Sequence, residues 1–201
     1  MKTAIRNVRR HAAQFMRQFM RHDYEVMDDG LYFPRSRVMA RGAYAVRLAD
    51  GSWQEEPNLV TLQGREYLLK VALGGQAAQA GWYLALFSGD YTPEDGLTAA
   101  TFPVSAGEIT STTDGYSDAT RRPWQPGPVS NAEMSNEASP ATFHIVTPRD
   151  AVDVYGAALL SAQARGSTDG VLLSAARFRV RKQFENGEPV QLRYRTYLLP
   201  E

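Results

Sequence analysis

Few residues in this sequence have the types and spacing that catalysis or metal binding requires. The three histidines, His11, His22 and His144, match no metal-ligand spacing, and the chain has no cysteine to supply thiolate ligands. Acidic residues gather between positions 23 and 29, but without the ordered loop and closing glutamate of a calcium site. No phosphate-binding glycine loop, nucleophile elbow or H-E-x-x-H motif occurs. These observations predict a protein that is not an enzyme and has no catalytic residues, metal or cofactor.

Two pairs of adjacent carboxylates, Glu55-Glu56 and Glu94-Asp95, have the chemistry for acid–base catalysis. Both pairs fall in segments that read as turns, and exposed charged residues usually face solvent. We therefore expect all four side chains to be solvated.

Alternating arginines near the end of the sequence form the clearest binding pattern. Side chains alternate across a strand, so each set of arginines is expected to share one face. If both sets share a face, five guanidinium groups form a basic patch that can bind carboxylates of a protein partner. The alternatives are a nucleic-acid backbone, which we favour less because stacking aromatics are sparse, and a solvated face paired with Glu185 and Glu188. The arginines are Arg177, Arg179 and Arg181 in one expected strand and Arg193 and Arg195 in the next.

A second candidate contact is the segment that contains Arg121, Arg122 and Trp124. Tryptophan and arginine are common anchors of protein interfaces, and the flanking prolines stiffen the loop. The alternative is that Trp124 covers the hydrophobic core.

Composition and charge suit a folded protein with an unevenly charged chain. The 201 residues are 43% hydrophobic, which fits one domain with an appendage or two small domains. No apolar run approaches the ~20 residues that span a bilayer, and arginines interrupt any secretory signal at the N-terminus. Residues 1–47 carry a net charge of +6 and the remainder −6. We expect a soluble protein, assembled in a reducing cytosol, whose charge asymmetry favours association.

Residues 2–22 predict an amphipathic helix with an apolar stripe that includes Phe15 and Phe19, and with Arg9 and Arg10 on its other sides. A helix of this length is marginal alone in water, so its stripe must pack on something. Three interpretations remain open: packing on its own domain, docking on a neighbouring subunit or partner, and, least favoured, lying on a membrane.

The rest of the chain predicts a mainly β fold. A hairpin with a turn at Asp50-Gly51 is expected within residues 31–62, followed by a helix that starts after Gly64. The buried face of this helix is expected to consist of Tyr67, Leu68, Val71 and Ala72. Asn186-Gly187 predicts a further hairpin turn, and the long segment 90–127 contains a short helical turn at 103–109. The expected fold is an antiparallel β-sandwich, of which a jelly roll is one form, with an N-terminal amphipathic helix and a small hairpin. The expected parts of the chain are a helical arm at 1–30, a short hairpin and helix at 31–80 and the β-sandwich domain at 81–201. The strands expected in the sandwich are 82–88, 128–135, 141–147, 153–161, 170–181 and 190–199. The expected core includes Trp82, Leu84, Leu86, Phe143, Ile145, Tyr155, Leu159, Leu172, Phe178 and Tyr194.

Five segments follow one another along the chain: GWYLALFSGDYTP at 81–93, ATRRPW at 119–124, SNEASPATF at 135–143, GAALLS at 156–161 and GVLLSAARF at 170–178. In this order they resemble segments of small virion proteins of tailed bacteriophages. The resemblance spans residues 58–199 and rests on the amino-acid sequences of the strands and turns. It implies a virion structural protein, either a capsid decoration (cement) protein or a collar or head–tail junction protein, assembled in the host cytoplasm. Its implied partners are other copies of itself and other virion proteins, such as major capsid, portal or adaptor proteins.

The alternative function is a receptor- or carbohydrate-binding module of the fibre type, and an enzyme ranks third. Aromatic side chains on a β-sandwich suit sugar binding, although core packing explains most of them more simply. The candidate aromatics are Trp53, Trp82, Tyr91, Tyr116 and Trp124.

Overall fold

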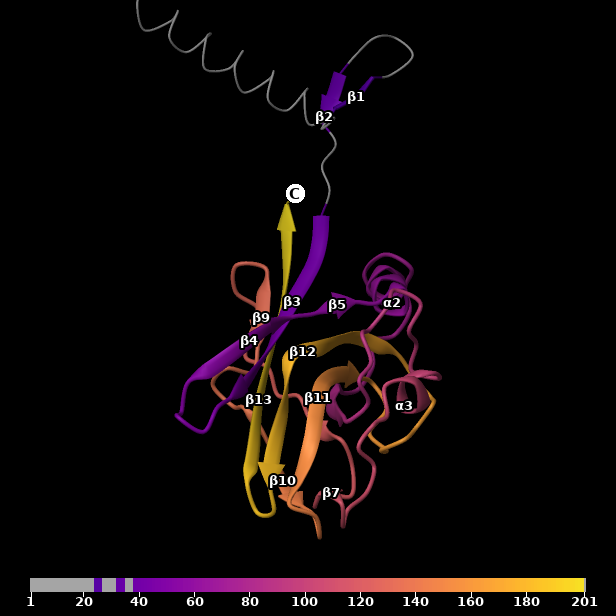
Figure 1. Ribbon diagram of the computed structural model, residues 1–201. Coiled ribbons are helices and arrows are strands. Elements are labelled where there is room, and N and C mark those ends of the chain that lie inside the picture. Colours follow the sequence, from indigo (N-terminus) through magenta and orange to yellow (C-terminus); the bar gives the residue numbers. More distant parts are fainter. Residues whose placement is uncertain (1–23, 27–31, 35–37, 201) are drawn as a thin grey trace, which may run out of the picture. The chain divides into compact units, whose positions relative to one another are not determined.

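The computed structural model describes residues 24–26, 32–34 and 38–200, and the side chains within 38–199 (Figure 1). The described chain is mainly β. Residues 40–198 form one compact unit, and the short antiparallel pair β1 (Tyr24–Val26) and β2 (Tyr32–Pro34) belongs to another. The helix predicted for residues 2–22 lies outside the described residues.

Two antiparallel sheets build the compact unit. The six-stranded sheet has the order β4-β3-β13-β10-β7, and β9 pairs with β13 beside this path. The five-stranded sheet has the order β5-β12-β11-β6-β8. The first sheet consists of β3 (Val38–Arg47), β4 (Trp53–Pro57), β7 (Gly115–Tyr116), β9 (Glu133–Ser135), β10 (Ala141–Val146) and β13 (Pro189–Pro200), and the second of β5 (Leu59–Val60), β6 (Tyr83–Phe87), β8 (Arg122–Pro123), β11 (Ala151–Leu160) and β12 (Leu172–Glu185).

The strands expected from residue 82 onward are all present, with shifted boundaries, and so is the earlier hairpin of β3 and β4. The expected division near residue 80 falls inside the compact unit, because β3 and β4 share a sheet with β13, and β5 shares one with β12. Alternation along each strand therefore predicted the elements well, although it carried no information on which strands pair across long sequence separations.

The predicted turn at Asn186-Gly187 forms, but it does not make a two-stranded hairpin. Gly187 has a φ of +87° and its backbone N donates to the carbonyl of Ile145 at 2.9 Å. The turn instead leads the chain from β12 in the five-stranded sheet to β13 in the six-stranded sheet. The chain also changes sheet at Asn58, between β4 and β5.

The central strands of the five-stranded sheet are buried on both faces. In β6, Leu84 and Leu86 belong to the main core, which both sheets share, whereas Ala85 and Phe87 belong to a second core. The second core is completed by the connection after β6, including Phe102 of α3 (Phe102–Ser105). Burial on both faces explains why the sequence of β6 is a continuous apolar run.

The residues predicted for the core are confirmed. Eight of the ten are buried, and the other two, Trp82 and Tyr155, are partly buried against the two cores. The buried eight are Leu84, Leu86, Phe143, Ile145, Leu159, Leu172, Phe178 and Tyr194.

Helix α2 (Leu62–Ala72) packs on β12 through a glycine. Thr61 caps the helix by accepting a hydrogen bond from the Gly64 backbone N at 3.0 Å, so the helix starts two residues before this glycine instead of after it. A Cβ at Gly64 would lie 2.3 Å from the carbonyl oxygen of Leu173, which shows how closely the helix approaches the strand. Tyr67 is buried as expected, but the predicted burial of Leu68 and Ala72 is wrong, because both are exposed.

Gly156 of β11 gives a test of the close packing on both faces of the five-stranded sheet. A Cβ at Gly156 would lie 2.2 Å from the Ala176 carbonyl oxygen and 2.2 Å from the Phe87 ring. We expect Gly156→Ala to lower the free energy of unfolding by about 2 kcal/mol, as overpacking does. Gly96→Ala is the control, because nothing lies within 4 Å of its Cβ position. Urea unfolding midpoints measure both, and an unchanged midpoint for Gly156→Ala would contradict the two-sided packing of β11.

Candidate functional site

Arg121, expected at the surface, is fully buried in an ion pair with Glu108. Its Nε and Nη2 donate to the two carboxylate oxygens of Glu108, both at 2.7 Å. The same guanidinium donates to the carbonyls of Ala162 at 2.9 Å and Ser167 at 3.1 Å. Gly166 completes the site, since its backbone N donates to Glu108 at 3.1 Å. The expectation that Arg121 is an exposed interface anchor is therefore wrong. Its guanidinium is buried, and the hydrogen bonds that it donates go to groups of the same chain.

The neighbours of Arg121 are divided between surface and core. Arg122 on β8 is about one third exposed and pairs with Asp118 at 2.7 Å. Trp124 is buried, and its ring nitrogen donates to the carbonyl of Tyr194 at 3.2 Å. Trp124 thus takes the second of its two expected roles, as part of the core.

The three arginines of β12 pair with carboxylates from three different segments. Val154 pairs with Lys182 and Gly156 pairs with Arg177, so four residues of β12 stand opposite the single intervening residue of β11. This bulge interrupts the regular pairing of β12 with β11 beside the arginines. Arg177 pairs with Asp90 after β6, Arg179 with Glu56 of β4 at 3.5 Å, and Arg181 with Asp153 of β11 at 3.1 Å.

Arg193 and Arg195 lie on the outer face of the six-stranded sheet. Both side chains reach across β3 to β4, where Arg195 pairs with Glu55 at 2.8 Å and Arg193 stacks 3.7 Å above the Trp53 ring. Arg193 also pairs with Glu137 at 3.3 Å. The crossing is open because β3 presents only small alanine side chains at this part of its outer face.

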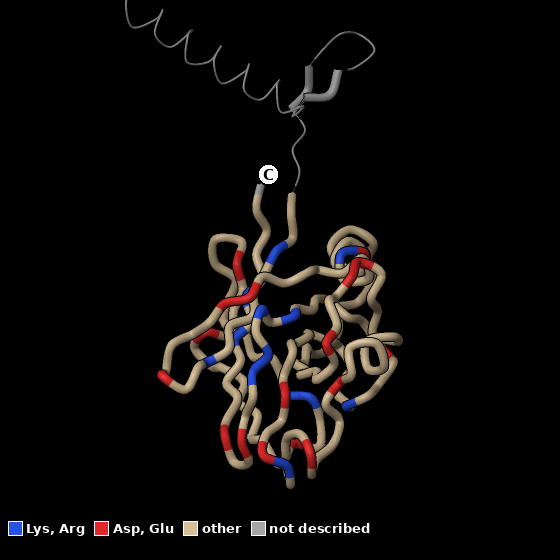
Figure 2. The backbone as a smooth tube through the Cα atoms, viewed as in Figure 1, with Lys and Arg blue, Asp and Glu red and all other residues tan. Residues whose placement is uncertain are grey.

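The five arginines therefore form intrachain ion pairs instead of one continuous free patch. The alternative of a solvated face expected Glu185 and Glu188 as carboxylate partners, but neither residue takes part in these ion pairs. Figure 2 shows the same mixing of charge, with basic and acidic positions interspersed over the two sheets. Glu56 also differs from expectation, since it is buried at 1% exposure. The interface residues expected at Arg9, Arg10, Phe15 and Phe19 lie outside the described residues.

A buried tyrosine network, not anticipated from the sequence, joins the two sheets. The Tyr44 hydroxyl on β3 lies 2.9 Å from the hydroxyl of Ser174 on β12. Ser174 donates to the Tyr194 hydroxyl at 3.0 Å, and Asn58 donates to the same hydroxyl at 3.2 Å. Burial raises the pKa of Tyr44 well above its ordinary value, and it also raises the pKa of Tyr194.

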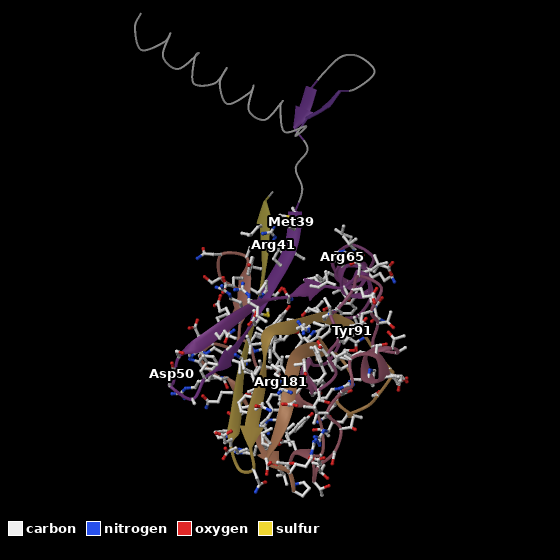
Figure 3. All side chains as sticks on the ribbon, viewed as in Figure 1. Met39, Arg41, Asp50, Arg65, Tyr91 and Arg181 are labelled. Atoms are coloured by element: carbon white, nitrogen blue, oxygen red, sulfur yellow. The ribbon has the colours of Figure 1, made fainter. Side chains whose placement is uncertain are left out.

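An exposed apolar stripe runs along α2. Leu62 and Leu69 lie in the helix, Leu73 is its C-cap residue, and the three side chains are 47%, 61% and 84% exposed. Their spacings of seven and four residues are those of one side of a helix. The helix is held in place by Arg65, which binds Asp95 through two hydrogen bonds of 2.8 and 2.9 Å (Figure 3 labels Arg65). We call these three residues the leucine stripe. It is a fixed apolar surface beside the second core.

The described residues contain no group of three or more potential metal ligands, and His144 is exposed on β10. Within the same residues, no helix is long and apolar enough to cross a membrane. No protein-family model matches the chain, and no curated protein matches it.

The Arg121–Glu108 pair supplies a stability test. Arg121→Met leaves a buried carboxylate without its counter-charge, and we expect it to lower the free energy of unfolding by about 3–5 kcal/mol. Arg122→Met removes a partly solvated pair and should cost under about 1 kcal/mol. Chemical denaturation of both variants measures the difference. Equal effects would mean that Glu108 does not depend on Arg121.

The tyrosine network predicts alkaline sensitivity. The folded-state pKa of Tyr44 lies above the unfolded value of about 10, so its protonated form stabilises the fold fully below that pH. This stabilisation is lost as pH rises from about 10 toward the folded pKa. Tyr44→Phe should therefore show a smaller loss of unfolding free energy between about pH 9 and 11 than the parent protein, from a baseline about 1 kcal/mol lower. Tyr83→Phe, a tyrosine outside the network, is the control and should keep the parent slope.

Proposed function

We propose that this protein is a structural component of a tailed-bacteriophage virion that acts through protein–protein contacts, as a capsid decoration protein or a collar or head–tail junction protein. The observation that carries the proposal is the leucine stripe. Apolar side chains fixed on an ordered helix are stabilised when a neighbouring protein covers them. The proposed occupant is a neighbouring virion protein.

The resemblance to small virion proteins supports the kind of assembly. The segments that carry it fold as β6, β8, β10, β11 and β12, which supply most of the main core. The two antiparallel sheets and the core that they share also favour the expected β-sandwich, and a jelly-roll arrangement of it remains a prediction.

The alternative, a carbohydrate- or receptor-binding fibre module, is less well supported. Tyr116 and Trp124 are buried, and Trp82 and Tyr91 pack against the two cores. The ring of Trp53 is stacked by Arg193. The aromatic rings that would stack on a sugar are thus occupied by contacts within the chain.

Cryo-electron microscopy of purified virions tests the proposal. Copies spread over the head would identify a decoration protein, whereas a single closed ring at one vertex would identify a collar or junction protein. Absence from particles would overturn the proposal. In a complementation assay, Leu69→Gln with Leu73→Gln should reduce incorporation at least about tenfold, because the contact loses two buried leucines. Val104→Gln, which changes another exposed apolar residue on α3, should incorporate normally.

A further inference from the structure

A groove with an unusual charge environment lies between the β3–β4 turn and the start of β13. Its volume is about 530 Å³, within the range of sites that hold small ligands or a few side chains. Leu48, Phe184 and Pro189 supply apolar surface. Figure 3 labels Arg181, which lines the groove, and Asp50, which lies between two lining residues of the turn.

Two cations of this groove differ from most others in the described chain. Ten arginines and lysines form ion pairs with carboxylates of the chain. Arg47 instead donates to the amide oxygen of Gln191 at 2.8 Å, and Lys182 donates to the amide oxygen of Gln54 at 2.6 Å. A neutral amide positions a cation without neutralising it. Both groups therefore keep their full charge inside one groove.

Two further charged groups line the groove. Arg181 is paired with Asp153 at 3.1 Å, whereas the Glu188 carboxylate accepts only the neutral backbone N of Glu185, at 2.7 Å, and keeps its negative charge. Arg47, Lys182 and Glu188 together leave a net charge of +1 beside an apolar surface, with both cations held in position by amide oxygens. A guanidinium binds a carboxylate through two parallel hydrogen bonds, and an ammonium adds a compact point charge.

We propose that this groove binds an acidic segment of a partner protein, in which adjacent glutamate or aspartate side chains meet Arg47 and Lys182 and a neighbouring apolar side chain packs on Phe184 and Leu48. The proposal deepens the proposed function, because the acidic segment would belong to a neighbouring protein of the assembly. An extended nucleic-acid backbone is less favoured, since it needs a longer row of free cations than this groove supplies.

Titration of the full-length protein with a blocked hexapeptide, Ser-Leu-Glu-Glu-Phe-Ser, tests the site by amide chemical shifts in NMR spectra. We expect saturable shifts confined to the groove residues, and little response to the matching peptide with two glutamines. Arg47→Gln and Lys182→Gln should each raise Kd about tenfold, in line with the loss of one charge-assisted hydrogen bond. Arg47→Lys should restore part of the affinity.

Arg149→Gln is the matched control, because it removes a cation that pairs with Asp114 and does not line the groove. Equal binding of the glutamine peptide, or equal weakening by Arg149→Gln, would overturn the proposal. Tighter binding of a twelve-nucleotide oligothymidine at the same residues would replace the acidic peptide by a phosphate backbone and overturn it too. Because the titration needs no virion, its failure is distinguishable from absence of the protein from particles.

Discussion

The buried ion pair between Arg121 and Glu108 is the constraint on which the long connections of this protein depend. Two charges without solvent contact are tolerated only when hydrogen bonds satisfy the remaining atoms of both groups. That requirement brings together three stretches that are distant in sequence: the residues after α3, the residue just before β8 and the connection between β11 and β12. The pair therefore orders a part of the chain that contains little regular secondary structure. The tyrosine network around Ser174 has a similar role between the two sheets, where it fixes how their inner faces meet.

Much of the fold was predictable because its physical causes are local. The continuous apolar run of β6 and the alternation along β10 each act over a few residues, and both strands formed as expected. The Asn186-Gly187 turn also formed, but it joins two sheets instead of closing a hairpin. The partners of β13 could not be predicted, because pairing with β3, β9 and β10 depends on residues far away in the chain. The leucine stripe illustrates the same limit. Periodicity identified an amphipathic helix, but a close glycine contact decided which side faced the sheet.

The candidate site was harder to predict than the fold, because it depends on which charges meet. Arg177, Arg179 and Arg181 alternate in sequence, yet each pairs with a different carboxylate, and a bulge interrupts the strand pairing beside them. A bulge adds residues to one strand without leaving a distinct sequence pattern. The two cations of the groove gave no sequence signal either, since Arg47 and Lys182 are far apart in the chain and ordinary in their local context. Their significance comes from the amide oxygens that hold them.

The central place of β13 in the six-stranded sheet has a consequence for synthesis of the chain. β3 needs β13 as its neighbour, and the ribosome makes β13 long after β3 has emerged. At 5–20 residues per second, the intervening residues take roughly 7 to 30 s to translate. Throughout that time one edge of β3 is unpaired, and an unpaired strand edge can add to strands of other chains. Until β13 has been made, the nascent chain can therefore associate with other nascent chains through β3.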